Sequence, residues 1–79
     1  MKVKVRGVRC VRITGEYIKL DALLKFASIA STGGEAKHRI QSGEVVVSKH
    51  ICTARGKKIR PGDVVRCGES IILVKQAVL

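Results

Sequence analysis

Apolar and polar residues alternate along the first part of the chain. In residues 1–6 lysine and arginine occupy the even positions and valine two of the odd ones, and an extended pattern resumes after Gly7 over residues 9–14. A period of two is typical of a strand with one buried face. We therefore expect a strand over residues 1–6 and a second extended segment over 9–14, with Gly7 forming either a bulge or a turn.

A helical period replaces the alternation over residues 19–27. Four apolar residues share the spacing i, i+3, i+4 and i+7, namely Leu20, Leu23, Leu24 and Ala27. This spacing places them on one face of a helix, so they are expected to pack in the core. Asp21 lies in the first turn, four residues before Lys25, where the helix dipole and an ion pair both stabilise slightly.

A second helix is predicted from its capping residues. Thr32 can accept a hydrogen bond from the N–H of Glu35, and the Glu35 carboxylate can reach back to Thr32 as in a capping box. Ala36 and Ile40 are one turn apart and can face the core. Gly43 is suited to the left-handed position that ends the helix, and the linker between the helices, residues 28–31, carries an apolar Ile29 that favours an angled helix pair.

The second half of the chain reads as short strands and turns. Residues 44–47 form a strand with β-branched side chains on both faces, Ser48-Lys49 takes the place of a hairpin turn, and residues 51–53 return antiparallel. Residues 55–58 form a basic loop. Pro61-Gly62-Asp63 predicts a type II turn, and Gly68 centres a final hairpin over 64–74. The expected fold class is α+β, with two short packed helices against a small, mostly antiparallel sheet.

Composition points to a polyanionic partner. The 79 residues include 16 Lys and Arg against 6 Asp and Glu, a net charge of +10, while 46% hydrophobic residues exclude a disordered basic tail. The longest apolar run, residues 71–74, is too short to span a membrane. The three cysteines form no CxxC pair and the chain starts without a signal-type segment, so we expect a cytoplasmic protein.

Catalytic and metal chemistry find little support in these residues. No Ser, His and acid fall together in a catalytic motif, so we expect no enzyme and no small-molecule substrate. Cys52 and His50 could give two metal ligands, but their spacing is weak evidence, and the thiols are better explained as small hydrophobes. We expect no metal and no cofactor. The glycines before Glu35 either admit a phosphate to the helix N-terminus or merely precede a capped helix.

Basic residues gather in three segments that we expect to lie together as one electropositive surface. They are the second helix (Lys37, His38, Arg39), the hairpin turn (Lys49) and the basic loop (Arg55, Lys57, Lys58, with Arg60). Tyr17 and Phe26 are the two aromatic residues, too few for the stacking platforms of single-strand binders. Recognition of the backbone and shape of a folded nucleic acid is the mode that remains.

The spacing of three motifs resembles the S4 RNA-binding domain family. They are Lys19-Leu20-Asp21-x-x-Leu24, then Thr32-x-x-Glu35-Ala36-x-x-x-Ile40-x-x-Gly43-x-Val45-x-Val47, and Pro61-Gly62-Asp63-x-Val65. The resemblance covers residues 19–65 and is strongest to small stand-alone bacterial S4-domain proteins, in which a segment like Thr32 to Lys37 opens the second helix. Many family members have an arginine where Gly33 stands and Asn-Gly where Ser48-Lys49 stands.

The resemblance implies a small S4-like (alpha-L) fold that is not catalytic and binds structured RNA, ribosomal or transfer RNA. Carried over by position, the RNA-binding residues are Lys19, Lys37, His38, Arg39, Lys49, Arg55, Lys57 and Lys58. The chain is then one domain over 1–79, with an S4-like core over 19–65, a C-terminal hairpin over 64–74 and an N-terminal strand extension over 1–14 that adds a basic sheet edge. We expect a monomer. The alternatives are a general nucleic-acid binder that includes DNA, an assembly factor that seeks an acidic protein, and, third, a thiol or metal sensor.

Overall fold

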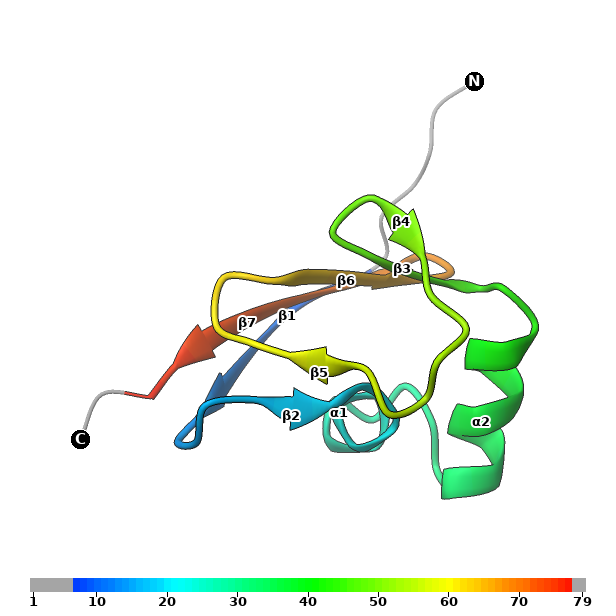
Figure 1. Ribbon diagram of the computed structural model, residues 1–79, viewed down its shortest axis with the longest axis horizontal. Helices are drawn as coiled ribbons and strands as arrows, with labels where there is room; N and C mark the ends of the chain where they lie inside the picture. The colour runs from blue at the N-terminus through cyan, green and yellow to red at the C-terminus, as the bar shows by residue number, and fades with distance from the viewer. Residues whose placement is uncertain (1–6, 78–79) are drawn as a thin grey trace.

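The computed structural model describes residues 7–77 as two helices packed against a sheet (Figure 1). The elements in chain order are β1 (Gly7–Ile13), β2 (Ile18–Lys19), α1 (Leu20–Phe26), α2 (Gly33–Gln41), β3 (Val45–Val47), β4 (His50–Ile51), β5 (Lys58–Ile59), β6 (Val64–Cys67) and β7 (Ser70–Gln76). The α+β class is confirmed. The strand expected over residues 1–6 lies outside the described residues.

Five strands form the main sheet in the order β1-β7-β6-β3-β4. The β7–β6, β6–β3 and β3–β4 pairs are antiparallel, and β1 lies parallel to β7 from Gly7↔Ser70 to Ile13↔Gln76. The sheet is therefore mostly antiparallel, as predicted. The extended segment after Gly7 adds a strand at the edge of the sheet, and β4 forms the opposite edge.

Both helices cover the same face of this sheet, and the core lies between the two layers (Figure 1). The sheet contributes alternate residues of four strands, Val11, Ile13, Val45, Val47, Val65, Cys67, Ile72 and Val74. From the helices, Leu20, Leu23, Leu24, Ala36 and Ile40 have no exposed surface. The leucine stripe and the Ala36–Ile40 pair thus bury the residues that their helical spacing selected.

The ends of α2 follow the predicted capping pattern with one shift. The Thr32 Oγ1 accepts a hydrogen bond from the Glu35 N–H at 3.1 Å. The Glu35 Oε2 accepts from the Ser31 N–H at 3.1 Å, so the carboxylate reaches one residue further back than expected. Gly43 has φ +84°, the left-handed conformation that ends the helix.

Three tight turns set the register of the sheet. Ser48 and Lys49 have φ +47° and +77°, so the β3–β4 turn has primed geometry although neither residue is glycine. Gly62 has φ +98°, and the Asp63 N–H donates to the Arg60 carbonyl at 3.0 Å, as in a type II turn. Gly68, at φ +59°, begins the turn between β6 and β7.

A second, two-stranded sheet was not predicted. β2 and β5 pair antiparallel, with Ile18 opposite Ile59 and Lys19 opposite Lys58. Their ladder continues into the start of α1, where the Leu20 N–H donates to the Lys57 carbonyl at 2.9 Å and the Asp21 N–H donates to the Arg55 carbonyl at 3.1 Å. The basic loop is therefore fixed to the N-terminus of α1 through its backbone.

None of the helices in the described part of the chain is long and apolar enough to cross a membrane.

Candidate nucleic-acid interface

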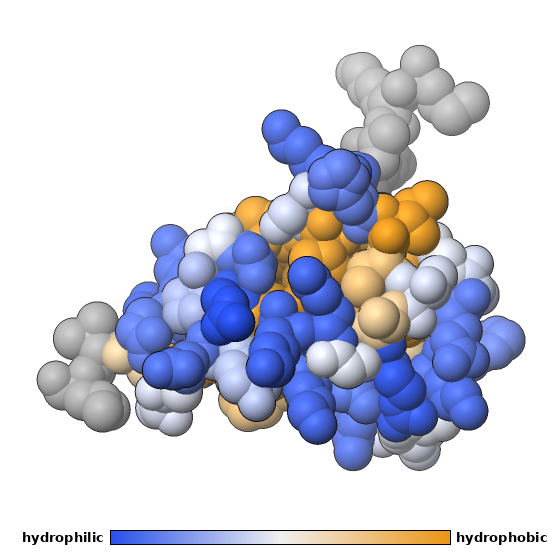
Figure 2. Space-filling model, in the orientation of Figure 1, coloured by the Kyte–Doolittle hydropathy of each residue, from blue (hydrophilic) through white to orange (hydrophobic). Residues whose placement is uncertain are grey.

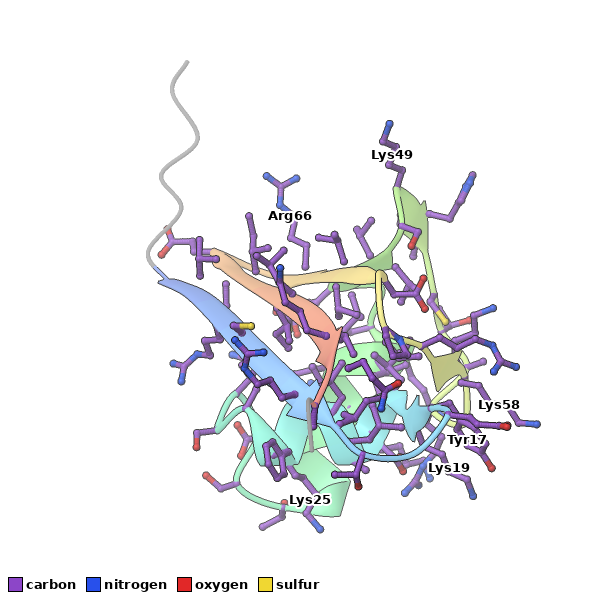
Figure 3. The ribbon with its side chains drawn as sticks, turned by 90° about the vertical axis from the view of Figure 1, so that its left-hand side faces the viewer. Tyr17, Lys19, Lys25, Lys49, Lys58 and Arg66 are labelled. Atoms are coloured by element: carbon purple, nitrogen blue, oxygen red, sulfur yellow. The ribbon has the colours of Figure 1, made fainter. Side chains whose placement is uncertain are left out.

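The two-stranded sheet brings together basic residues that are far apart in the sequence. We call the group Lys19, Arg55, Lys57, Lys58 and Arg60 the cationic cluster. Lys19 is opposite Lys58 in the β2–β5 ladder, and Figure 3 shows both side chains on the same side of the molecule, beside Tyr17. Because the backbone of residues 55–59 is hydrogen-bonded to β2 and α1, these cations have a defined position.

Tyr17 holds two members of the cationic cluster. The Lys58 Nζ lies 4.9 Å and the Arg60 Cζ lies 5.9 Å from the centre of the Tyr17 ring. Cation–π contacts at exposed sites are worth about 0.5–1 kcal/mol each. Tyr17 is 40% exposed, and because the face of its ring is near these cations we assign it a role in positioning them.

A hollow beside the cluster is lined by basic and polar side chains and by the apolar residues Val47, Ile51 and Cys52. Its lining includes Lys57, Lys58, Arg60 and His50, together with Ser48 and Asp63 of the turns that flank β3 and β6. The Asp63 carboxylate accepts hydrogen bonds from the Arg60 N–H at 2.8 Å and from the Ser48 Oγ at 3.4 Å. The acid in this hollow thus has structural partners, and the lysines are exposed to solvent.

Arg55 differs from the other members of the cationic cluster because it has an acidic partner. Its Nε and Nη2 atoms donate to the Asp21 Oδ2 at 3.2 and 3.1 Å. Within residues 7–77, Asp21 pairs with Arg55 and not with Lys25, its expected partner. An exposed pair of this kind stabilises the fold by about 0–1 kcal/mol. Its main consequence is local, since it joins the loop to α1.

The predicted residues of α2 are not among the described residues that line the hollow. Lys37 and His38 are exposed. Arg39 is half-buried, and its Nη1 lies 3.5 Å from the Cys67 Sγ. The structure therefore places this guanidinium against the core and gives it a packing role that the sequence did not indicate.

Lys49 points to another side of the molecule. It lines a depression on the sheet face opposite the helices, together with Val46, Val64, Arg66 and Ile71. Figure 3 shows Lys49 and Arg66 above the sheet, away from Lys19, Lys58 and Tyr17. Lys49 thus lies with Arg66 on this face of the sheet and not with the cationic cluster, and one continuous electropositive surface over all three basic segments stays a prediction.

The three cysteines are free thiols in different surroundings. Cys10 is exposed, Cys52 is half-buried and donates to the Ala54 carbonyl at 3.7 Å, and Cys67 is buried. Burial raises the pKa of the Cys67 thiol, and the nearby Arg39 guanidinium opposes that rise. In the described part of the chain no three His, Cys, Asp or Glu side chains gather as metal ligands would.

Reasoning from the sequence missed two side chains at this surface. Tyr17 was counted only as an isolated aromatic, and its position beside Lys58 depends on the β2–β5 pair. His50 was weighed as a metal ligand, yet it lines the hollow as the first residue after the β3–β4 turn. The signal for His50 was its place directly after a predicted turn; Tyr17 had no comparable signal.

Comparison with known proteins extends the resemblance beyond the three motifs. The family model of the S4 domain matches residues 11–75 and so includes part of β1, which the motif spacing left out. A relative from Bacillus subtilis (strain 168), described as the probable ribosome maturation protein RlbA, is 38% identical over 55 residues. That similarity covers 70% of this chain and 78% of the relative.

Proposed function

The chain belongs to the S4 domain family, and from that premise we propose that it is a non-catalytic protein that binds structured RNA through the cationic cluster. The proposal extends to residues that line the adjoining hollow, Lys57, Lys58, Arg60 and His50. Lys37 and His38 of α2 form a second, exposed contact region on the same molecule. Arg39 and Lys49, which the motif comparison also suggested, are not part of this surface.

One observation carries the proposal. Backbone hydrogen bonds hold β2, the loop and β5 together, so that their lysine and arginine residues lie close to one another, and Arg55 is ion-paired with Asp21. Side chains on an already ordered backbone lose less conformational entropy on contacting phosphates than side chains on a mobile segment do. Phosphate contacts supply most of the affinity of such surfaces and set their register on the nucleic acid.

A folded RNA suits this surface better than a single strand. Phe26 is not among the residues that line the hollow, and the Tyr17 ring lies close to two cations, so a row of unpaired bases has no stacking platform there. A-form helices are recognised mainly through their shape, their phosphates and their 2′-hydroxyl groups. We therefore propose a double-helical or hairpin RNA as the ligand.

Ribosomal RNA is the preferred candidate within that class. The Bacillus relative is described as a probable ribosome maturation protein, and ribosomal RNA offers many short A-form helices. We propose that the protein acts in the cytoplasm as a monomer that binds ribosomal RNA, with transfer RNA as the second choice. No cofactor, metal or small-molecule substrate enters this proposal.

Charge reversal in the cluster tests the proposal. In Lys57→Glu with Lys58→Glu, binding to an RNA hairpin, followed by fluorescence anisotropy, is expected to weaken about a hundredfold, because each lost charge-assisted contact is worth about 1.5 kcal/mol or more.

The matched control is Lys25→Glu with Lys75→Glu, which changes the net charge equally. Both lysines are exposed and neither is among the described residues lining the hollow. This control should lose no more than about threefold, the part that follows from net charge alone. Equal losses in the two double variants would contradict a localised binding surface.

A further inference from the structure

The main sheet has a second face that the helices do not cover. Residues of five strands point to it, and their rows follow from the register. One row runs Ile51, Val46, Arg66, Ile71 and Val8 across β4, β3, β6, β7 and β1, and the next contains Val64, Leu73 and Cys10. We call these eight residues the outer sheet face.

This face exposes more large apolar side chains than its surroundings do. Ile51 is 69%, Val8 62% and Val64 42% exposed, and Val46, Ile71 and Leu73 are partly exposed. Figure 2 shows hydrophobic surface in the upper part of the molecule, where Figure 1 places β3, β4 and β6, above a mainly hydrophilic lower part. Contiguous apolar patches on small proteins commonly mark interaction sites.

The sequence pattern of two strands is typical of a sheet that is buried on both faces. Val45–Val47 and the run from Ile71 to Val74 are apolar at every position, a pattern typical of strands covered on both sides. The helices bury only Val45, Val47, Ile72 and Val74. The intervening side chains therefore lack a covering layer in the described part of the chain.

The basic residues around the outer sheet face indicate what kind of partner it can bind. Arg66 lies in the middle of the apolar row, and Lys49 lines the same depression. Arg12 and Lys75 are paired in register and continue the face at its far end. Asp63, the residue before β6, accepts hydrogen bonds from Arg60 and Ser48. An apolar centre with a basic rim is complementary to a segment that is apolar on one side and acidic around it.

Two other occupants fit less well. A second copy of this chain would set Arg66 and Lys49 against the same cations, and each copy carries +10. RNA would bury the valine and isoleucine side chains against polar groups, and neither aromatic residue of the chain, Tyr17 or Phe26, belongs to this face to stack on its bases.

We propose that the outer sheet face docks an acidic amphipathic segment of a partner protein, independently of the RNA-binding surface. Apolar side chains of the segment cover Val46, Ile51 and Ile71, and its carboxylates pair with Arg66 and Lys49. The two sides of the molecule then have different ligands, RNA on the cationic cluster and protein on the sheet.

The probe is a labelled synthetic helix of about 18 residues, roughly five turns, with leucine along one face and glutamate elsewhere. Comparison peptides carry lysine for glutamate or alanine for leucine. Binding to the full chain is followed by anisotropy. We expect saturable binding of the leucine–glutamate peptide, with affinity at least about tenfold higher than that of either comparison peptide.

Substitutions on the outer sheet face test whether the peptide binds there. Val64→Thr with Ile71→Thr changes two residues that line the depression on the outer sheet face and are not among those lining the hollow beside the cationic cluster. It keeps β-branched residues and net charge, so it should fold and lose about tenfold in peptide affinity. Arg66→Gln should weaken peptide binding several-fold, whereas Lys25→Gln, on the opposite side of the molecule in Figure 3, removes the same charge with less than about a twofold effect. Thermal unfolding monitored by circular dichroism checks each fold.

Three results would overturn the inference. One is that the leucine–glutamate peptide fails to bind, or binds Val64→Thr with Ile71→Thr as well as it binds the unaltered chain. The second is that this variant loses affinity for an RNA hairpin, which would assign the face to nucleic acid. The third is that sedimentation equilibrium shows a dimer that the variant dissociates, which would make a second copy the occupant.

Discussion

Arg39 and Arg55 show how the surroundings of one side chain decide its role. Both lie in segments that looked equally basic in the sequence. Arg55 donates to Asp21 at the surface, whereas Arg39 lies against the thiol of a buried cysteine. Neither contact could be predicted, because the residues that meet are 34 and 28 positions apart. The sequence therefore shows which residues carry a positive charge, but it does not show which of these side chains are free to bind a ligand.

Cys67 carries a residue-scale prediction. Burial raises the pKa of its thiol above the usual value near 9.0. The folded-state pKa thus lies above that of the unfolded chain, so the stability that comes from a neutral thiol is complete at neutral pH and is lost as pH rises through the folded value. Chemical unfolding at about pH 7 and about pH 10 should show a larger drop in unfolding free energy for the natural chain than for Cys67→Ala.

The alanine variant retains every other titrating group, so the comparison isolates the thiol. It will be less stable at both pH values because it leaves a cavity. An identical drop with pH in both proteins would mean that the buried thiol does not control alkaline stability.

At the scale of elements, long periodic segments were predictable, whereas the two-residue strands β2 and β5 were not. The leucine stripe of α1, the capping of α2 and the β6–β7 hairpin follow from spacing, caps and Gly68. β2 and β5 have two residues each, too few for any period, and pair across a separation set by the rest of the fold. The pair that organises the cationic cluster was therefore hidden from sequence reasoning.

The β3–β4 turn gives a prediction at this scale. Ser48 and Lys49 both adopt positive φ, which costs about 1 kcal/mol or more for residues other than glycine. Ser48→Asn with Lys49→Gly supplies the sequence that primed turns prefer. In urea titrations the free energy of unfolding of the double variant should be about 1 kcal/mol higher than that of the natural chain. This net value includes the loss of the long Ser48–Asp63 hydrogen bond.

Ser48→Ala with Lys49→Ala serves as the control. It removes the same side-chain contacts and keeps the strain, so it should not stabilise the protein. Equal stability of the Asn-Gly and Ala-Ala variants would show that the positive φ angles carry no penalty.

At the scale of the whole molecule, composition predicted the excess of positive charge, and the fold decides where it lies. Two of the basic segments lie on different sides, with Lys49 near Arg66 and Lys58 beside Lys19 (Figure 3). The α+β class and the order of most elements were accessible from patterning. The division of charge was not, because it depends on which sheet face each strand residue takes and on the β2–β5 pair.

RNA binding by this protein is proposed to depend on contacts between the cationic cluster and the phosphates of structured RNA. The most direct test is a salt titration of binding to one hairpin sequence made as RNA and as DNA. Five phosphate contacts predict a log–log slope of about −4 against salt concentration, by analogy with duplex DNA. We expect such a slope together with a clear preference for RNA; weak, equal affinity for RNA and DNA would show that the cationic cluster does not recognise structured RNA.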